Sequence, residues 1–112
     1  MSFLSDEDRY RILKLLESQP ELSQRQIARE LSVSLGKVNF CLKALIDKGL
    51  VKARRFSRSP NKKAYLYIPT LKGIEEKGKV TLRFLAKKQQ EHQELISEIE
   101  SLKAEVGKLS KV

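Results

Sequence analysis

Apolar side chains recur at helical spacing at the start of the chain and predict two short helices. Between residues 6 and 18 they form one stripe, and Pro20 interrupts the pattern soon afterwards. Ser23 and Gln26 then have the spacing of a capping box, in which each side chain satisfies a backbone N–H at the helix start. The second helix is therefore expected to run from this cap to Leu31.

A third helix is predicted to follow a second cap at Ser34. Its apolar residues fall on one face, and Gly49 stands where a helix commonly ends in a left-handed residue. The residues expected to be buried on this face are Val38, Cys41, Leu42, Leu45 and Ile46.

The composition then changes to that of a β-hairpin. Residues 50–56 and 64–68 are rich in aromatic and branched side chains, which favour strands. Residues 57–63 between them are polar and contain a Pro-Asn pair, which is typical of a turn. The pattern predicts two antiparallel strands with a basic tip.

The rest of the chain is predicted to be one long helix that begins at the cap residue Thr70. Apolar residues repeat in its second half at alternating spacings of three and four, which is the pattern of a coiled coil. Gly78, Thr81 and Lys88 fall in the same seam, so we expect the first half to pack on its own domain. The predicted dimerisation residues are Leu85, His92, Leu95, Ile99, Leu102, Val106 and Leu109.

Together these elements predict a mainly α fold with a small β-hairpin, namely a winged helix-turn-helix. Ala28 is small where the second and third helices must approach, Ser32 lies in the turn, and Val38 supplies the apolar plug. We assign residues 1–69 to a DNA-binding domain and residues 70–112 to a C-terminal dimerisation helix.

The charge distribution points to a polyanionic partner. The 112 residues include 23 Lys and Arg against 14 Asp and Glu, a formal net charge of +9. Residues 48–74 carry eight basic side chains and no acidic one. The residues expected to contact the DNA backbone from the wing and its surroundings are Arg25, Arg54, Arg55, Arg58, Asn61, Lys62 and Lys63.

The outer face of the third helix has side chains suited to the major groove of double-stranded DNA. Asn39 suits adenine, Lys37 suits guanine or phosphate, and Phe40 suits a thymine methyl group. The predicted recognition residues are Ser34, Gly36, Lys37, Asn39, Phe40 and Lys43.

The run Ser34-Leu35-Gly36-Lys37-Val38-Asn39, with Ser23–Ala28 before it and Thr70–Lys77 after it, resembles small MarR-type regulators associated with exopolysaccharide gene clusters. The resemblance covers nearly the whole chain. It implies a bacterial transcriptional regulator, dimeric, of surface polysaccharide genes. Larger MarR proteins have an extra N-terminal dimerisation helix beside a ligand pocket, and the lack of residues for that helix argues against a small-molecule inducer site.

Other classes of function find little support. One His and one Cys leave no acid–base pair or metal site, so we expect neither an enzyme nor a cofactor. No apolar stretch reaches the length of a membrane span or signal peptide, and a single cysteine suits a reducing compartment, so a cytoplasmic protein is expected. The alternative is an adaptor that binds protein or RNA through its head and a different protein through its last helix.

Three finer expectations concern single positions. Cys41 is expected to be a buried structural thiol rather than a redox sensor. His92 is expected to fix the coiled-coil register rather than to make dimerisation pH-sensitive. An antiparallel pair would set the basic half of the last helix against the acidic half but would oppose the apolar seam to Gly78, Thr81 and Lys88. A parallel homodimer, with Glu98 beside Lys103 of the partner, is therefore favoured.

Overall fold

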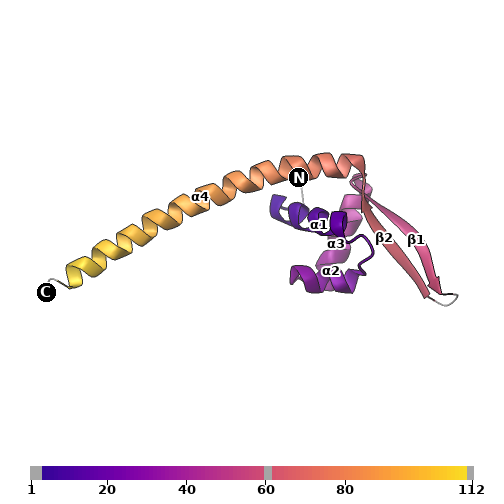
Figure 1. The fold of residues 1–112 in the computed structure, drawn as a ribbon, viewed down its shortest axis with the longest axis horizontal. Coiled ribbons are helices and arrows are strands. Elements are labelled where there is room, and N and C mark those ends of the chain that lie inside the picture. The colour runs from indigo at the N-terminus through magenta and orange to yellow at the C-terminus, as the bar shows by residue number, and fades with distance from the viewer. Residues whose placement is uncertain (1–3, 60–61, 111–112) are drawn as a thin grey trace.

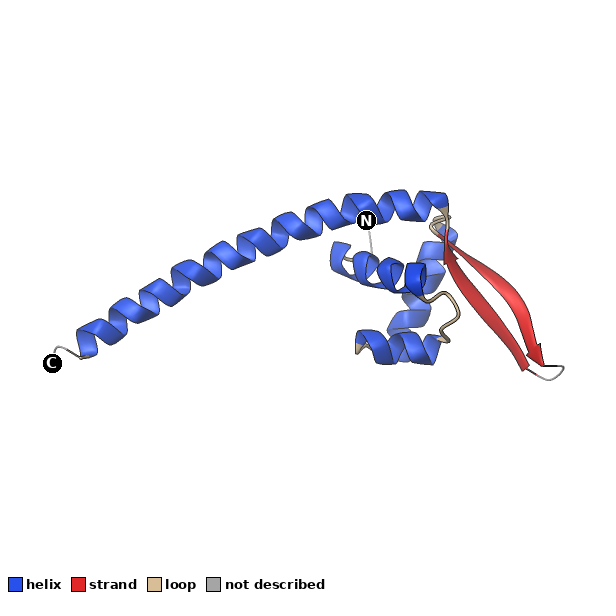
Figure 2. Ribbon diagram, viewed as in Figure 1, coloured by secondary structure: helices blue, strands red, loops and turns tan. Residues whose placement is uncertain are grey.

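The computed structural model describes residues 4–59 and 62–110, and the side chains of residues 57–63 lie outside the described part. A compact head of three helices and a hairpin is joined to one long helix, and the molecule measures 76 × 28 × 24 Å (Figures 1 and 2). In chain order the elements are α1 (Asp6–Ser18), α2 (Gln24–Leu31), α3 (Leu35–Asp47), β1 (Val51–Ser59), β2 (Lys62–Pro69) and α4 (Leu71–Leu109). The predicted winged helix with a long last helix is confirmed.

Local capping signals determine where the short helices begin and end. Ser23 Oγ accepts from the Gln26 N–H at 3.2 Å, and the Gln26 side chain accepts from the Ser23 N–H at 2.8 Å, which completes the capping box. Ser34 caps α3 by accepting from the Lys37 N–H at 3.0 Å. Gly49 follows α3 with φ +73°, a conformation in which a side chain would be strained.

One apolar cluster holds α1, α2, α3 and the base of the hairpin together. Leu13 and Leu16 of α1, Ile27 of α2 and Leu45 of α3 are fully buried at its centre. The predicted plug Val38 is also buried, so the inward face of α3 is the one that its apolar spacing indicated.

The strands are longer than the sequence indicated. The polar residues 57–63 were expected to form the connection, but β1 continues to Ser59 and β2 starts at Lys62, with an irregularity in register between Ser57 and Ser59. Strand pairing uses backbone N–H and C=O groups, so polar side chains on a ribbon that projects from the head do not prevent it. Side-chain composition therefore predicted a longer turn than the structure has.

The start of α4 is held against the end of α3. Thr70 caps α4 by accepting from the Gly73 N–H, while its own hydroxyl donates to the Gly49 carbonyl oxygen at 2.6 Å. The Thr70 N–H also donates to the Leu50 carbonyl oxygen at 3.0 Å. Because this corner is short, α4 returns directly over α1.

The first half of α4 packs along α1 and the second half extends away from the head (Figure 1). Val80 is fully buried there, and the ring of Phe84 stacks on Tyr10 with centroids 5.2 Å apart. From residue 85 to the end of α4 the side chains are exposed, apart from the half-buried Gly107. Among the described residues, no helix combines the length and apolar character needed to cross a membrane.

Candidate nucleic-acid interface

The candidate interface lies on the side of the head away from α4. The ribbon of β1 and β2 slants away from α4, and its far end lies on the same side as α2 (Figure 1). The capped amino ends of α2 and α3 carry backbone N–H groups and the positive end of the helix dipole. Such ends bind anions, phosphates included.

The outward face of α3 is formed by three of the predicted recognition residues. Gly36, Phe40 and Lys43 lie opposite the buried face and are all exposed. The Phe40 side chain is 50% exposed, which is unusual for a large aromatic residue on a helix surface. A Cβ at Gly36 would meet only the Ser34 hydroxyl at 4.0 Å, so this turn presents bare backbone.

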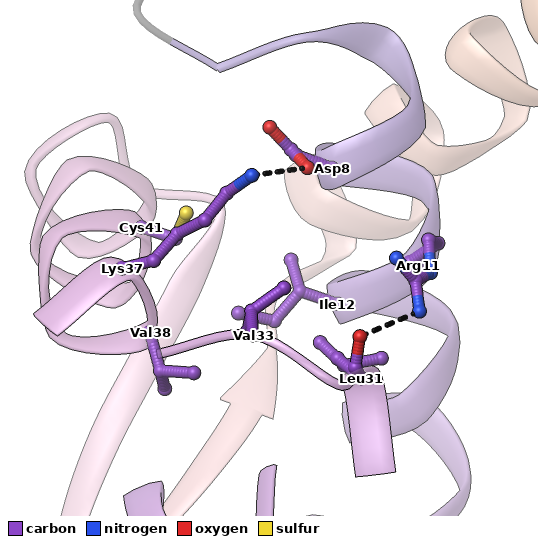
Figure 3. A pocket seen from close by; sticks show the side chains of 8 residues that line it. All are labelled: Asp8, Arg11, Ile12, Leu31, Val33, Lys37, Val38 and Cys41. Atoms are coloured by element: carbon purple, nitrogen blue, oxygen red, sulfur yellow. Dashed lines mark hydrogen bonds and ion pairs between the residues drawn. The ribbon is translucent and has the colours of Figure 1, made fainter. Parts of the chain in front are cut away.

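Lys37 instead lies on the flank of α3 that faces α1. Its Nζ is 3.3 Å from a carboxylate oxygen of Asp8 (Figure 3). Beside this pair is a cavity of about 20 Å³, room for a single water molecule and too small for an organic effector. A contact of Lys37 with DNA therefore competes with the ion pair.

The expected buried thiol Cys41 borders the same cavity and is 5% exposed. Burial raises the pKa of this thiol, and the nearby Asp8 carboxylate raises it further. A buried thiol with a raised pKa is poorly suited to redox sensing.

Asn39 is half-buried and belongs to a hydrogen-bond chain across three elements. Its amide nitrogen donates to Gln24 Oε1 of α2 at 3.2 Å, and the Gln24 amide nitrogen donates to the Tyr67 hydroxyl of β2 at 3.1 Å. The chain orients the Asn39 amide and ties the recognition helix to the wing. Sequence reasoning missed Gln24 and Tyr67, because residues so far apart along the chain give no periodic signal.

The wing presents cations on both faces. Neighbouring residues of a strand point to opposite faces, so Arg54 and Arg55 do too, and both are exposed. The Arg55 guanidinium lies 5.9 Å from the ring centroid of its cross-strand partner Tyr65, which in turn stacks near Tyr67. Since Tyr67 bonds to α2, the Arg55 face is the one that continues onto the helix-turn-helix.

A groove joins this face of the wing to α2. Glu21, Ser23, Gln24 and Gln26 line one side, and Ala64, Tyr65 and Tyr67 line the other. The groove has a volume of about 240 Å³. Arg25, one residue after Gln24, is exposed at the same helix end, so a cation borders the N–H groups there.

The other predicted contacts are distributed differently. Asn61 lies outside the described residues, as do the side chains of Arg58, Lys62 and Lys63. Two members of the basic run lie elsewhere: Lys72 donates to the Lys48 carbonyl oxygen at 3.2 Å, beside the start of α4. The predicted dimerisation residues from Leu85 to Leu109 are all exposed on α4.

Comparison with known proteins agrees with this geometry. Residues 6–52 match the family model described as winged helix-turn-helix DNA-binding. No curated protein sequence matches the chain.

Solved structures of MarR-family regulators share the fold. The DNA complex of MepR from S. aureus superposes with a TM-score of 0.65 at 24% identity, over 95% of this chain and 77% of that one. A ZitR variant from Lactococcus lactis gives 0.58 at 26% identity, over 94% and 75%. A MarR-family regulator from Rhodococcus sp. RHA1 gives a TM-score of 0.59 at 22% identity over 73% of this chain. The match covers only 56% of the length of that protein.

Proposed function

We propose that this chain is a sequence-specific transcriptional regulator that binds double-stranded DNA as a homodimer. Two observations carry the proposal: the amino end of α2 and the Tyr65–Tyr67 face of the wing line one groove, and the hydrogen-bond chain Asn39–Gln24–Tyr67 ties α3 to both. An α-helix fits the major groove of B-DNA, and a β-ribbon beside it reaches the neighbouring backbone.

In this proposal α3 reads the bases. Gly36 permits close approach, Phe40 contacts thymine methyl groups, and Lys43 donates to guanine or to a phosphate. One N–H of the Asn39 amide donates to Gln24, and in this proposal the second N–H and the amide oxygen read adenine. These contacts supply the discrimination between sequences.

The helix ends and the wing supply affinity that is independent of sequence. Arg25 and the amino end of α2 bind one phosphate group, and Arg54 and Arg55 follow the backbone on either side of the ribbon. Arg58, Asn61, Lys62 and Lys63 extend this contact toward the tip. Each neutralised phosphate releases counterions, which makes binding dependent on salt.

The second copy is proposed to pair through the exposed apolar residues of α4. Two heads require two half-sites, and in operators of dimeric helix-turn-helix proteins these lie about 10 bp, or a multiple of that, apart. The resemblance to MarR-type regulators of exopolysaccharide clusters supports surface polysaccharide genes as the target. The fold similarity to the MepR–DNA complex supports DNA as the ligand.

The test is selection of bound fragments from random DNA, followed by titration of the enriched site at several salt concentrations. We expect a pseudo-palindromic sequence and, if each head neutralises about three to five phosphates, a slope of log affinity against log salt of roughly −5 to −9. Absence of any enriched sequence, or a slope near zero, would contradict the proposal.

A further inference from the structure

The long helix exposes apolar side chains from its first residue, well before the coiled-coil segment that the sequence indicated. In its first half Leu71 is 76% exposed and Leu82 71%, and Ile74 and Leu85 are exposed as well. Leu71, Ile74 and Leu85 continue the heptad seam of the second half, while Leu82 lies on its edge. The first and fourth heptad positions from Leu71 to Leu109 together form one surface, the long seam.

The head covers a different side of α4. Val80 is buried there and Phe84 stacks on Tyr10 of α1, while Gly73 lies against Leu50. Ion pairs with α1 are made by Glu76, Lys77 and Arg83. Phe84 flanks the long seam, whereas Gly73 and Val80 lie farther round the helix, so none of the three belongs to it. Among the described seam residues Thr81 is half-buried and all the others are exposed.

We propose that the long seam is covered by α4 of a second copy running antiparallel, with the two-fold axis beside Gln90. The inference rests on the proposed homodimer and adds its orientation. The two ends of the helix then face each other, so that the exposed residues of the first half meet the predicted seam of the second.

In this register, each large apolar residue in the seam of one copy faces either a large apolar residue or a small one in the seam of the other. Leu71 faces the partner's Leu109, Ile74 faces its Val106, and Leu85 faces its Leu95. Antiparallel coiled coils pair the first and fourth heptad positions in this way, and every layer here obeys that rule.

The weak positions of the first half also find fitting partners. A Cβ at Gly78 would meet nothing within 4 Å, and the partner's Leu102 fills that space. Thr81 faces the partner's Ile99. The two layers on either side of the axis, in which Lys88 of each copy faces His92 of the other, are polar, and buried polar positions are a common device for fixing register.

One edge of the seam matches in both charge and apolarity. Glu75 lies beside the partner's Lys103, Leu82 beside its Ile96, and Gln89 beside its own counterpart. This pairing accounts for Leu82 and Ile96, the two large exposed apolar residues of α4 that stand outside the seam itself.

The other edge contains one attractive and one repulsive pair. Lys77, whose ammonium is 2.6 Å from a carboxylate oxygen of Glu17 in α1, lies beside the partner's Glu105, whereas Glu91 lies beside its own counterpart. The Lys88 ammonium, 3.1 Å from a carboxylate oxygen of Glu91 in the same helix, offsets that repulsion.

The overall charge of the helix favours the same orientation. Residues 71–88 contain six basic and two acidic side chains, and residues 89–110 contain five acidic and two basic ones. Antiparallel pairing sets the basic half of one copy along the acidic half of the other.

A parallel pair would oppose Gly78 to Gly78 and Lys88 to Lys88, leaving a gap and a like-charge contact in the seam. It would also leave Leu82 and Ile96 apart. The sequence favoured a parallel pair because antiparallel pairing sets the apolar seam of residues 92–109 against Gly78, Thr81 and Lys88, and because Glu98 matches Lys103 of a parallel partner. The exposure of Leu71, Ile74 and Leu82 favours the antiparallel pair instead, since this pairing covers them.

The antiparallel register also separates the heads suitably for DNA. The head contacts α4 between Gly73 and Phe84, and the midpoint of that stretch lies about 35 Å from its counterpart at about 1.5 Å per residue. Half-sites one turn apart on B-DNA are separated by about 34–36 Å.

Disulfide cross-linking distinguishes the orientations in the full-length protein. Leu85→Cys and Leu95→Cys are made as separate variants and oxidised alone or mixed, and mass spectrometry identifies the joined peptides so that the native Cys41 is accounted for. We expect the mixture to give a cross-linked dimer between the two positions and each variant alone to give none. Cross-links in each variant alone, or no cross-link from a sample that sediments as a dimer, overturn the antiparallel register.

A charge exchange gives a second readout that does not depend on cysteine. Glu75→Lys or Lys103→Glu alone is expected to weaken dimerisation about fivefold, and the double variant is expected to restore it, since surface ion pairs contribute modestly. The matched controls Lys79→Glu and Glu100→Lys lie on the outer side of the helix and are expected to leave the dimer unchanged. Equal weakening by all four single variants, without restoration, overturns the proposed pairing.

The outcomes separate this inference from the proposed function. A protein that dimerises in the parallel orientation and binds an enriched operator overturns the register alone. A monomer at all concentrations overturns both the register and the homodimer, whereas DNA binding by a single head is measured independently on the same sample.

Discussion

Gly73 in the first turn of α4 lies directly against the backbone carbonyl of Leu50, so that a Cβ added to Gly73 would overlap that oxygen. The same carbonyl oxygen accepts the Thr70 N–H at 3.0 Å. This close approach lets the chain turn from β2 into α4 in one residue and fixes the direction in which the long helix leaves the head.

Gly73→Ala is therefore expected to destabilise the protein. The obstructing atoms are backbone and cannot rotate away, so we expect a loss of about 1–3 kcal/mol in the free energy of unfolding, as for other overpacked sites. Chemical denaturation followed by circular dichroism measures it. Gly107→Ala is the control, because a Cβ there meets nothing, and alanine is expected to stabilise the helix by up to about 1 kcal/mol. Equal effects at the two glycines would contradict the structural role of Gly73.

Phe40→Ala is expected to reduce discrimination between operator and random DNA without unfolding the head. The side chain is half exposed, so little core packing is lost. Loss of a base contact reduces discrimination by about 1–3 kcal/mol. Affinities for the two DNA sequences at one salt concentration measure the effect. A loss of the same size on both DNAs would remove Phe40 from base reading.

Arg55→Ala is expected to weaken binding to all DNA sequences alike. If the guanidinium contacts a phosphate, its removal lowers the magnitude of the salt slope by about 1 for each head. Titrations over a range of salt concentrations measure the slope, and Lys108→Ala, at the far end of α4, removes the same charge as a control. An unchanged slope for Arg55→Ala would mean that this face of the wing does not contact the duplex.

Asp6→Asn is expected to lower thermal stability near neutral pH and to have little effect in acid. Arg83 donates two hydrogen bonds to the Asp6 carboxylate, at 2.8 and 3.0 Å, and these lower the pKa of Asp6 below its ordinary value. A carboxyl with a lowered folded-state pKa stabilises the fold above its unfolded-state pKa and loses that contribution as pH falls through the folded-state value. The pair joins α1 to α4 at an exposed site, so we expect a shift of a few degrees at most.

The control for this variant is Glu7→Gln, which shares the first turn of α1 and its favourable interaction with the helix dipole. Melting temperatures of both variants and the unmodified protein are compared at neutral pH and at a pH below the pKa of Asp6. A difference between Asp6→Asn and the unmodified protein that persists in acid would exclude the carboxylate–Arg83 contact as its origin.

Replacing Leu95 and Leu102 together by Glu is expected to abolish the dimer and to weaken operator binding in the same variant. Both side chains are exposed in the single chain, so the head itself should fold normally. Sedimentation and DNA titration measure the two effects, and Ala104→Glu, on the outer side of the helix, is the control. Full operator affinity in a monomeric double variant would separate DNA binding from dimerisation.

Features that depend on neighbours within one or two helical turns were predictable from the sequence. The caps at Ser23, Ser34 and Thr70 and the helix end at Gly49 need only a side chain and a backbone group a few residues away. The inward face of α3 follows in the same way from spacing. The confirmed fold was predictable because these signals occur in the order that a winged helix requires.

The use of individual side chains was not predictable in this way. Lys37 and Asn39 lie on the same predicted outer face, yet one pairs with Asp8 and the other with Gln24. Periodicity gives the angle of a residue around its helix but not the identity of the element that packs beside it.

The sequence by itself determined the helices, their caps, the hairpin and the concentration of positive charge around it, since each of these depends on local chemistry and composition. Tertiary structure alone decided that Gly73 meets Leu50, that Gln24 joins Asn39 to Tyr67, and that Leu71 and Leu82 stay exposed while Val80 is buried. The physical reason is that a contact between distant segments depends on how whole helices pack, and α1 can cover only one side of α4.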